Sequence, residues 1–252
     1  MGKKYIVVGA SSGIGKAIAE QLLREGNQVA LLARRDKILK QFADEFNTDS
    51  KNRNAITIKY DSNQFDKSGT IFNKIVKELG GDLDGIIYAS GVMPAVGVDE
   101  YNTEKDLQML NTNLLGAIAI LNPAAEYFGK KGSGFIAGIS SIAGDRGRRG
   151  NPVYNTSKAG LNTYLEALRN RLAVKGVQIV TIKPGFVSTD MLAGVKVPDK
   201  GFLKPITAEE AAATIIRRIN SGSENFYVPA KWALVGLIIK NIPSFIFRKL
   251  NI

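Results

Sequence analysis

Short apolar runs recur along the chain, and most of them end at a turn that leads into an amphipathic segment. Residues 5–8 form one such run, rich in β-branched side chains, which is typical of a strand buried on both faces of a parallel sheet. Similar runs predict strands over residues 28–33, 55–60, 84–89, 134–139, 177–183 and 226–228. Because helical patterns separate these runs, we predict an α/β fold with a seven-stranded, mainly parallel sheet.

Residues 1–229 carry this pattern without a linker, a repeat or a low-complexity stretch, so we predict one domain there. Residues 230–252 differ, and form an apolar and basic extension. It begins with a nearly all-apolar run, residues 232–239, which Pro243 separates from a second apolar and basic run. Neither run approaches the roughly 20 residues of a bilayer-spanning helix. The extension therefore either lies in a membrane interface or packs as a helix against another subunit.

The composition narrows the choice of partners and chemistry. The chain of 252 residues has 34 Lys and Arg against 23 Asp and Glu, a formal net charge of +11. This excess favours an anionic partner such as a phosphorylated cofactor or an acidic membrane surface. We expect no nucleic acid, because no basic and aromatic recognition motif is present.

The chain has no cysteine and no histidine. Their absence excludes thiolate catalysis, Ser-His-Asp hydrolysis and any Cys- or His-ligated metal site. Proton chemistry must then use Tyr, Lys, Asp, Glu or water. The first apolar run is too short for a signal-peptide core, so we expect a cytoplasmic protein, peripheral at the inner face of the membrane if the extension binds lipid.

A glycine-rich turn joins the first predicted strand to the first predicted helix. Strand, glycine turn and helix in direct succession supply backbone N–H groups and a positive helix end, which together bind a pyrophosphate. The alternative is a plain tight turn. The residues that we expect to contact a nucleotide here are Gly9, Ser11, Ser12, Gly13, Ile14 and Gly15.

Arg34 and Arg35 follow the second predicted strand, where a dinucleotide fold places an acidic residue on the ribose of NAD. Guanidinium groups at this position bind the 2′-phosphate of NADP, so we predict NADP as the cofactor, with NAD as the alternative. The alternative interpretation is that both arginines are solvated at the start of a helix, where Asp36 partly neutralises them. Asp61 ends the third strand and either contacts the adenine or caps a helix. The other strand ends add Ser62, Ala89, Ser90, Gly91, Pro184, Gly185, Val187 and Thr189 to the predicted cofactor site.

Tyr154 and Lys158 stand four residues apart at the start of a long amphipathic run. Positions four apart share one face of a helix, so the phenol and the ammonium should point into one cavity. A nearby cation lowers the pKa of a phenol, and such a pair can exchange a proton with a substrate oxygen. The alternative is a helix start with a surface Tyr and Lys. Asn113 stands in an apolar helix face, where its amide either braces a kink or holds an ordered water.

Together these residues resemble the short-chain dehydrogenase/reductase family over nearly the whole chain. The match rests on the glycine turn, on Asn113, on Pro184-Gly185, and on a Ser–Tyr–Lys set formed by Ser141, Tyr154 and Lys158. The resemblance implies a doubly wound Rossmann fold and an NAD(P)-dependent oxidoreductase that is a homodimer or homotetramer. Tyr154 would be the catalytic acid–base, with Ser141 on the substrate oxygen. Lys158 would lower the pKa of the phenol and hold the nicotinamide ribose, and Asn113 would anchor a proton-relay water.

Two positions depart from the family pattern. Val8 stands where the family has Thr, and Tyr88-Ala89-Ser90-Gly91 stands where it has Asn-Asn-Ala-Gly. The second change leaves open how the fourth strand is braced.

A narrower resemblance links residues 143–149 and 242–250 to the reductases that form half of the decaprenylphosphoryl-ribose 2′-epimerase. It implies reduction of a 2-keto pentose on a polyprenyl phosphate, a cell-wall polysaccharide precursor, after oxidation by a flavoprotein partner. Arg146, Arg148 and Arg149 would then meet the lipid-linked phosphate, or else are solvated loop charges. The other hypotheses are a reductase of a small soluble carbonyl and a non-catalytic nucleotide sensor on the same fold.

Overall fold

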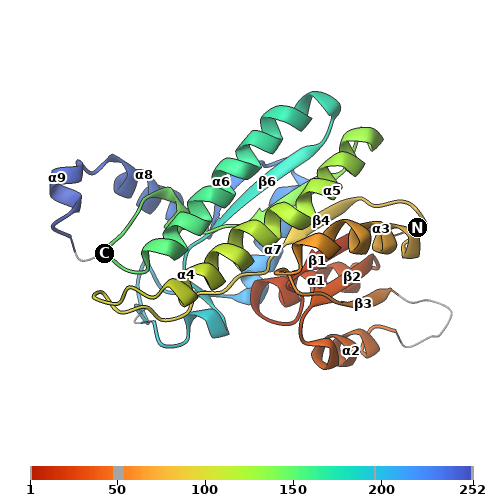
Figure 1. Ribbon diagram of the computed structural model, residues 1–252, viewed down its shortest axis with the longest axis horizontal. Helices are drawn as coiled ribbons and strands as arrows, with labels where there is room; N and C mark the ends of the chain where they lie inside the picture. Colours follow the sequence, from red (N-terminus) through yellow and green to blue (C-terminus); the bar gives the residue numbers. More distant parts are fainter. Residues whose placement is uncertain (1, 48–53, 196, 251–252) are drawn as a thin grey trace.

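A seven-stranded sheet forms the centre of the computed structural model, which describes residues 2–47, 54–195 and 197–250 (Figure 1). All neighbouring strands pair in parallel, in the order β3-β2-β1-β4-β5-β6-β9. The strands are β1 (Lys4–Val8), β2 (Gln28–Ala33), β3 (Ala55–Lys59), β4 (Gly85–Tyr88), β5 (Phe135–Ile139), β6 (Gln178–Pro184) and β9 (Asn225–Val228). Every predicted strand is present, and each end lies within one residue of its predicted place.

The strand order reverses beside β1. The chain runs outward from β1 through β2 to β3, and then returns to place β4 on the other side of β1. The connections that follow two neighbouring strands here run in opposite directions. A crevice therefore forms outside the carboxyl ends of these two strands, where ligands bind in such sheets. The glycine-rich turn after β1 and Ser90-Gly91 after β4 both lie at this crevice.

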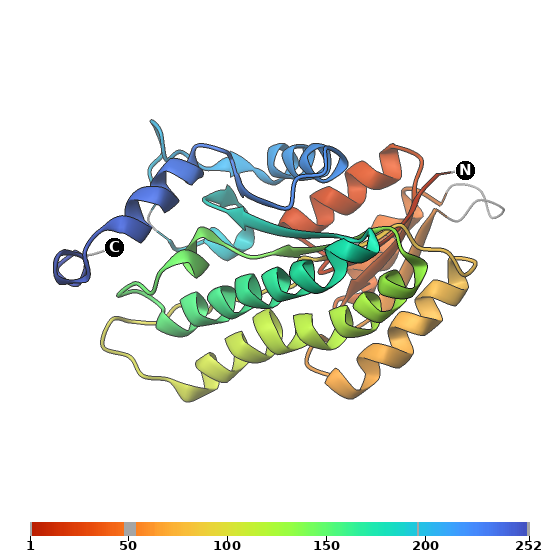
Figure 2. The same cartoon turned by 90° about the horizontal axis from the view of Figure 1, so that it is seen from above.

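Helices cover both faces of the sheet, as Figures 1 and 2 show. One face is covered by α1 (Gly13–Arg24), α2 (Asp36–Asp44) and α7 (Ala208–Asn220), and the other by α3 (Ser68–Glu78), α5 (Gly116–Lys131) and α6 (Pro152–Leu172). Helix α4 (Thr103–Leu110) precedes α5 and contacts α6. Helix α7 begins with a capping box, because Thr207 Oγ1 accepts from the backbone N–H of Glu210 and the Glu210 carboxylate accepts from that of Thr207.

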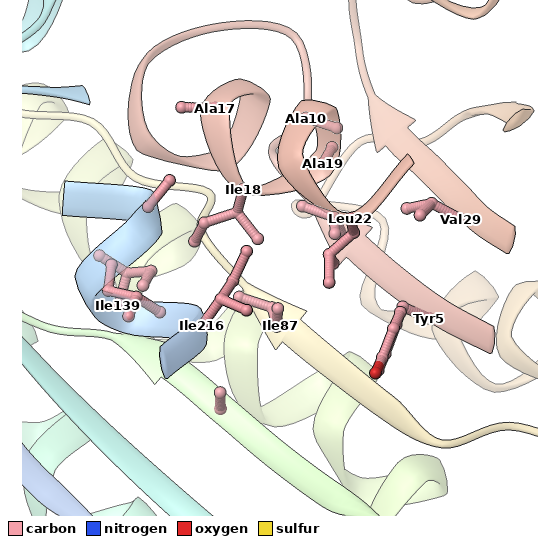
Figure 3. Close-up of a cluster of buried hydrophobic side chains, with 14 of the residues drawn as sticks. Tyr5, Ala10, Ala17, Ile18, Ala19, Leu22, Val29, Ile87, Ile139 and Ile216 are labelled. Carbon is pink, nitrogen blue, oxygen red and sulfur yellow. The ribbon is translucent and has the colours of Figure 1, made fainter. Parts of the chain in front are cut away.

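The core beneath α1 holds the glycine-rich turn in place. Figure 3 shows Ile18 of α1, Ile87 of β4 and Ile216 of α7 gathered in one cluster, and all three are buried. Truncating a buried side chain of this kind to Ala typically costs about 2–5 kcal/mol. Packing of this order fixes the start of α1 against the sheet, and the turn that precedes α1 is fixed with it.

A π-helical segment, η2 (Asn111–Leu115), joins α4 to α5 and is tied to β4. The hydroxyl of Tyr88 donates to the carbonyl oxygen of Thr112 at 2.5 Å, and Tyr88 is fully buried. Gly116 leaves room for this contact, since a Cβ there would lie 2.9 Å from the Tyr88 oxygen and 2.6 Å from the Ser62 carbonyl oxygen. Tyr88 therefore braces β4 at one of the positions where the chain departs from the family pattern.

The remaining elements are short. They are the 3₁₀ turns η1 (Phe65–Lys67), η3 (Ile142–Asp145), η4 (Ala173–Lys175) and η5 (Asp190–Leu192), and the paired strands β7 (Val187–Ser188) and β8 (Ile206–Thr207). The predicted extension contains α8 (Trp232–Asn241) and α9 (Ser244–Phe247), which stand out from one end of the body in both views (Figures 1 and 2). Among the described helices, none combines the length and the apolar character needed to cross a bilayer.

Candidate active site

One cavity of about 970 Å³ lies at the carboxyl edge of the sheet and collects almost all of the predicted site residues. The cavity is lined from the turns that follow β1, β2, β3, β4, β5 and β6, together with the start of α6. Of the predicted residues, those lining it are Gly9, Ser11, Ser12, Gly13, Ile14, Gly15, Arg34, Arg35, Asp61, Ser62, Ala89, Ser90, Gly91, Ser141, Arg148, Tyr154, Lys158, Pro184, Gly185, Val187 and Thr189.

Glycine is required in the turn after β1 for reasons of space and of backbone conformation. Gly9 has φ +90° and Gly13 has φ +54°, a region that L side chains rarely adopt. A Cβ on Gly9 would lie 2.6 Å from the backbone nitrogen of Ser90, and one on Gly15 would lie 2.3 Å from the carbonyl oxygen of Gly9. The turn therefore packs backbone against backbone, and its residues line the cavity.

Arg35 is attached to this turn. Its guanidinium donates to Ser11 Oγ at 2.9 Å and to Ser12 Oγ at 2.6 Å. Arg34 lines the cavity beside it. Asp36 does not neutralise the pair directly, because its carboxylate is bound by Lys40 at 2.8 Å, one helical turn along α2. The two guanidinium groups are thus at the cavity edge, and Arg35 also serves as the N-cap residue of α2.

Asp61 lies at the end of β3 and faces the cavity. Its Oδ1 accepts from the backbone N–H of Asn63 at 3.0 Å, a local turn rather than a helix cap, since the next helical turn begins at Phe65. The capping alternative for Asp61 was therefore wrong.

Tyr154 and Lys158 are both buried at the start of α6, with 8% and 3% of their surfaces exposed. Asn151 caps this helix in the left-handed region at φ 49°, and its Oδ1 accepts from the Tyr154 N–H at 3.3 Å. Lys158 Nζ donates to the Ile139 carbonyl oxygen at 3.0 Å and lies 5.8 Å from the centre of the Tyr154 ring. Ser141 follows β5, and its Oγ accepts from the Ala143 N–H at 3.0 Å.

Burial dominates the protonation of these groups. It raises the pKa of Tyr154 above its ordinary value, and a hydrogen bond from Ser141 and the charge of Arg148 oppose that rise. Burial lowers the pKa of Lys158 to about 8. Burial outweighs both opposing effects. Arg148 is the cation that lowers the pKa of the phenol when the protein groups are taken alone, and the effect expected of Lys158 stays a prediction for the protein with its cofactor bound.

Asn113 is fully buried in the π-helical segment, and its amide braces the structure. Its Nδ2 donates to the Val92 carbonyl oxygen at 3.0 Å and to Ser157 Oγ at 3.1 Å, while Oδ1 accepts from the Val92 N–H at 2.8 Å. Both amide N–H groups are therefore taken by protein atoms. This favours the bracing alternative and ties η2 to the segment after β4 and to α6.

Asp145 joins the loop after β5 to three other elements, and sequence reasoning gave it no role. Its Oδ1 lies 2.6 Å from Lys183 Nζ of β6 and 3.1 Å from Lys240 Nζ of α8, and its Oδ2 accepts from the Tyr227 hydroxyl of β9 at 2.7 Å. Its side chain is only 1% exposed. These charged contacts hold the pKa of Asp145 below its ordinary value against the effect of burial. The sequence signal that could have revealed this network is Lys183, a lysine near the end of the otherwise apolar strand β6.

Of the three predicted substrate arginines, only Arg148 lines the cavity. Arg146 faces the C-terminal extension: it donates to the carbonyl oxygens of Ile239 and Ile242 at 2.7 and 2.5 Å, and its guanidinium lies 3.9 Å from the centre of the Phe247 ring. Arg149 is exposed and is not among the lining residues. Neither alternative held for Arg146, because it neither lines the cavity nor stays solvated.

Trp232 is a further cavity residue that the sequence did not single out. Its ring meets Phe186 edge to face at 4.9 Å and lies so close to Gly185 that a Cβ on Gly185 would be 2.0 Å from a ring atom. The first residue of α8 thus forms part of the cavity wall.

Comparison with known proteins agrees with this geometry. A profile of short chain dehydrogenases matches residues 3–199. An uncharacterized oxidoreductase of Staphylococcus epidermidis is 31% identical over 222 residues, which are 88% of this chain and 92% of the relative. The structure of ElxO with NADP bound shares 26% identity at a TM-score of 0.77, covering 86% of this chain and 91% of that one. A short chain dehydrogenase from Burkholderia cenocepacia in complex with NADP has a TM-score of 0.82 over 99% of this chain and 97% of that one, at 20% identity, which concerns the fold alone.

Lys158 should make the stability of the protein depend on pH. Its pKa is about 8 in the folded protein and 10.5 ordinarily. Between these values the unfolded chain binds more protons, so the free energy of unfolding attributable to Lys158 rises with pH through this window and is constant below it. We expect Lys158→Met to lose the rise between about pH 8 and about pH 10, measured by urea unfolding without added nucleotide. Exposed Lys37→Met is the control, and parallel profiles for the wild type and Lys158→Met would contradict the assignment.

Proposed function

The chain belongs to the short-chain dehydrogenase family, and on that premise we propose that it is an NADP-dependent oxidoreductase that transfers a hydride to a carbonyl group. The observation that carries the proposal is the convergence of Ser141, Tyr154 and Lys158 on the same cavity as the glycine-rich turn and the Arg34-Arg35 pair. An acid–base group and a nucleotide-binding turn in one cavity are what hydride transfer to a carbonyl requires.

The residues present fit a phosphorylated dinucleotide. Gly9 and Gly15 hold the turn tightly against the backbone of Ser90 and against itself, and the residues of the turn line the cavity, as a pyrophosphate-binding turn requires. Arg34 and Arg35 stand at the end of β2, where guanidinium groups suit a 2′-phosphate. Support for NADP also comes from ElxO, whose structure has NADP bound. The other lining residues after β3, β4 and β6 would hold the remainder of the cofactor.

The catalytic roles follow from hydrogen-bonding capacity. When bound, the cofactor supplies the hydride. Tyr154 would transfer its hydroxyl proton to the carbonyl oxygen as the carbonyl carbon is reduced, so the product is an alcohol and the charges balance. Ser141 would donate to the same oxygen, and the positive charge of Lys158 would favour the phenolate left on Tyr154. Asn113 would hold the π-helical segment in the position that shapes this wall of the cavity.

For the substrate we propose the keto group of a polyprenylphosphoryl pentose, oxidised beforehand by a flavoprotein partner. The support is the positive charge at the cavity and an exposed apolar face on the extension. The second candidate, a small soluble carbonyl, is favoured by the size of the cavity, which at about 970 Å³ would hold a nucleotide with little room beside it.

We further propose that α8 and α9 contact an anionic membrane surface. Leu234, Leu237 and Ile238 of α8 and Phe245 and Ile246 of α9 are exposed by 42–62%, a row of large apolar side chains. Exposed Arg248 and Lys249 adjoin them. Lys240 contributes less than the sequence suggested, because it is paired with Asp145. Apolar groups beside exposed cations suit an anionic lipid surface, where each basic residue contributes about 1 kcal/mol. A second subunit is the alternative occupant.

Tyr154→Phe tests the acid–base role. The change deletes the hydroxyl and keeps the ring, so we expect NADPH oxidation with a carbonyl substrate to fall by at least about a hundredfold while NADPH affinity is retained. Tyr164→Phe is the matched control, because Tyr164 lies on the same helix and its hydroxyl donates to Asn122 outside the cavity. Near-normal turnover of Tyr154→Phe would remove Tyr154 from the mechanism.

Arg34 and Arg35 should set the cofactor preference. A charge-assisted hydrogen bond contributes about 1.5–3 kcal/mol, so NADPH should bind roughly tenfold or more tightly than NADH. Arg34→Ala and Arg35→Ala should each reduce this margin, and Lys37→Ala, which removes an exposed charge outside the cavity, should not. Fluorescence titration of each protein with NADPH and with NADH measures this ratio of affinities. Equal affinities in the unmodified protein would refute the assignment.

The membrane contact is tested by co-sedimentation with vesicles of phosphatidylcholine, with and without phosphatidylglycerol. We expect binding to the anionic vesicles that weakens with salt, and its loss in Leu237→Ser/Phe245→Ser. Point changes are preferred to truncation because Trp232 forms part of the cavity wall. Val174→Ser, at an apolar residue that is 87% exposed on η4, is the control. If the double variant instead changes the mass measured by light scattering, the face is a subunit interface.

A further inference from the structure

Arg148 lies at the substrate end of the cavity. It follows η3 in the loop between β5 and α6, is half-buried, and lines the cavity with Ser141 and Tyr154. The charges of Arg148 and Tyr154 act on each other. The guanidinium lowers the pKa of the phenol, and burial lowers the pKa of the guanidinium while the charge of Tyr154 opposes that fall. The glycine-rich turn and the Arg34-Arg35 pair follow β1 and β2. The phosphate groups of a dinucleotide can therefore bind there and do not need Arg148.

The loop that carries Arg148 is held from within the protein. Asn155, which is 4% exposed, donates through Nδ2 to the carbonyl oxygens of Arg148 and Gly150 at 3.4 and 3.2 Å. Asn151 donates to the Pro94 carbonyl oxygen at 3.2 Å and caps the helix of Tyr154. The backbone of Arg148 is therefore positioned by the residue that follows Tyr154, and its side chain is presented to the cavity.

The guanidinium of Arg148 forms no ion pair in the part of the chain that the structure describes, although the charge of Asp145 acts to raise its pKa. The neighbouring carboxylate, Asp145, is bound through Oδ1 by Lys183 and Lys240 and through Oδ2 by Tyr227. No hydrogen bond or ion pair among the described residues uses the Arg148 side chain. Arg146, two residues earlier, donates to two carbonyl oxygens and stacks on Phe247.

A partly desolvated guanidinium with unused donors is unfavourable unless an anion pairs with it. Its planar set of N–H groups matches a carboxylate or a phosphate in a bidentate manner. We propose that Arg148 is a substrate-recognition residue that binds a carboxylate or phosphate group on the carbonyl compound held at Ser141 and Tyr154. This proposal rests on the proposed function, because it assigns the substrate of that same cavity.

The test compares anionic carbonyls with neutral ones. The pairs are acetoacetate against its ethyl ester, and dihydroxyacetone phosphate against dihydroxyacetone, which separate the carboxylate source from the phosphate source. In NADPH oxidation, Arg148→Gln should lower the ratio of kcat/KM for the anionic over the neutral member at least about tenfold in one pair. Arg148→Lys should keep part of the ratio, and Arg149→Gln, which removes the adjacent exposed charge, should keep it all.

The ratio separates recognition from an effect on Tyr154. If Arg148→Gln slows both members of each pair equally, Arg148 acts through the phenol and the proposal is wrong. If it weakens NADPH binding instead, Arg148 is a cofactor residue, and the proposal is again wrong. Calorimetric titration of the NADP-loaded protein with acetoacetate and with dihydroxyacetone phosphate decides the matter without turnover. Anion affinities that are equal in wild type and Arg148→Gln overturn the recognition role, whereas absence of carbonyl-dependent NADPH oxidation overturns the proposed function.

Discussion

In a parallel sheet whose two faces are covered by helices, the side chains along the strands are buried. Polar functional groups and ligands are therefore found at the carboxyl ends of the strands. The four residues from Tyr5 to Val8 are buried along β1, and the glycine-rich turn begins at once after them. Ser90 follows β4 and Ser141 follows β5 in the same way. Because all strands point in one direction, these turns meet at one edge. Helix α6 then adds Tyr154 and Lys158 from the side, and their placement depends on the packing that holds α6 against β6.

This constraint explains what could be predicted from the sequence. A strand buried on both faces must be a continuous apolar run, so its ends are visible as changes of composition, and the predicted strands end within one residue of their observed limits. The glycine-rich turn is a local feature as well. The network around Asp145 is not local. Its partners Lys183 and Tyr227 lie 38 and 82 residues away, and a basic loop has the same sequence whether it is solvated or buried. The same limit applies to the pKa of Tyr154, because spacing places Lys158 near it, whereas desolvation depends on every element around the cavity.

Some of the positively charged side chains around the cavity are not paired with a carboxylate among the residues that the structure describes. Lys158 donates to a carbonyl oxygen from a buried position, and Arg148 faces the cavity without an ion-pair partner among those residues. The Asp145 carboxylate is shared by two lysines. Removing cations from water without pairing them is unfavourable, and sites that bind anions accept this cost in the free protein because the ligand offsets it. The fall of the Lys158 pKa to about 8 is one measure of that cost. The net charge of +11 acts in the same direction at longer range.

The extension is coupled to the cavity through two adjacent residues. Asp145 binds Lys240 of α8, and Arg146 binds the carbonyl oxygens of Ile239 and Ile242 at the end of the same helix. Both residues lie in the loop that begins at Ser141 and continues to Arg148, and Trp232 at the start of α8 forms part of the cavity wall. A displacement of α8 would therefore break charged contacts of a carboxylate that is almost fully buried, which is costly. The loop and the helix should consequently move as one unit. A displacement of α8 would thus also act on the position of Arg148, since the same loop carries Arg148 and the contacts to α8.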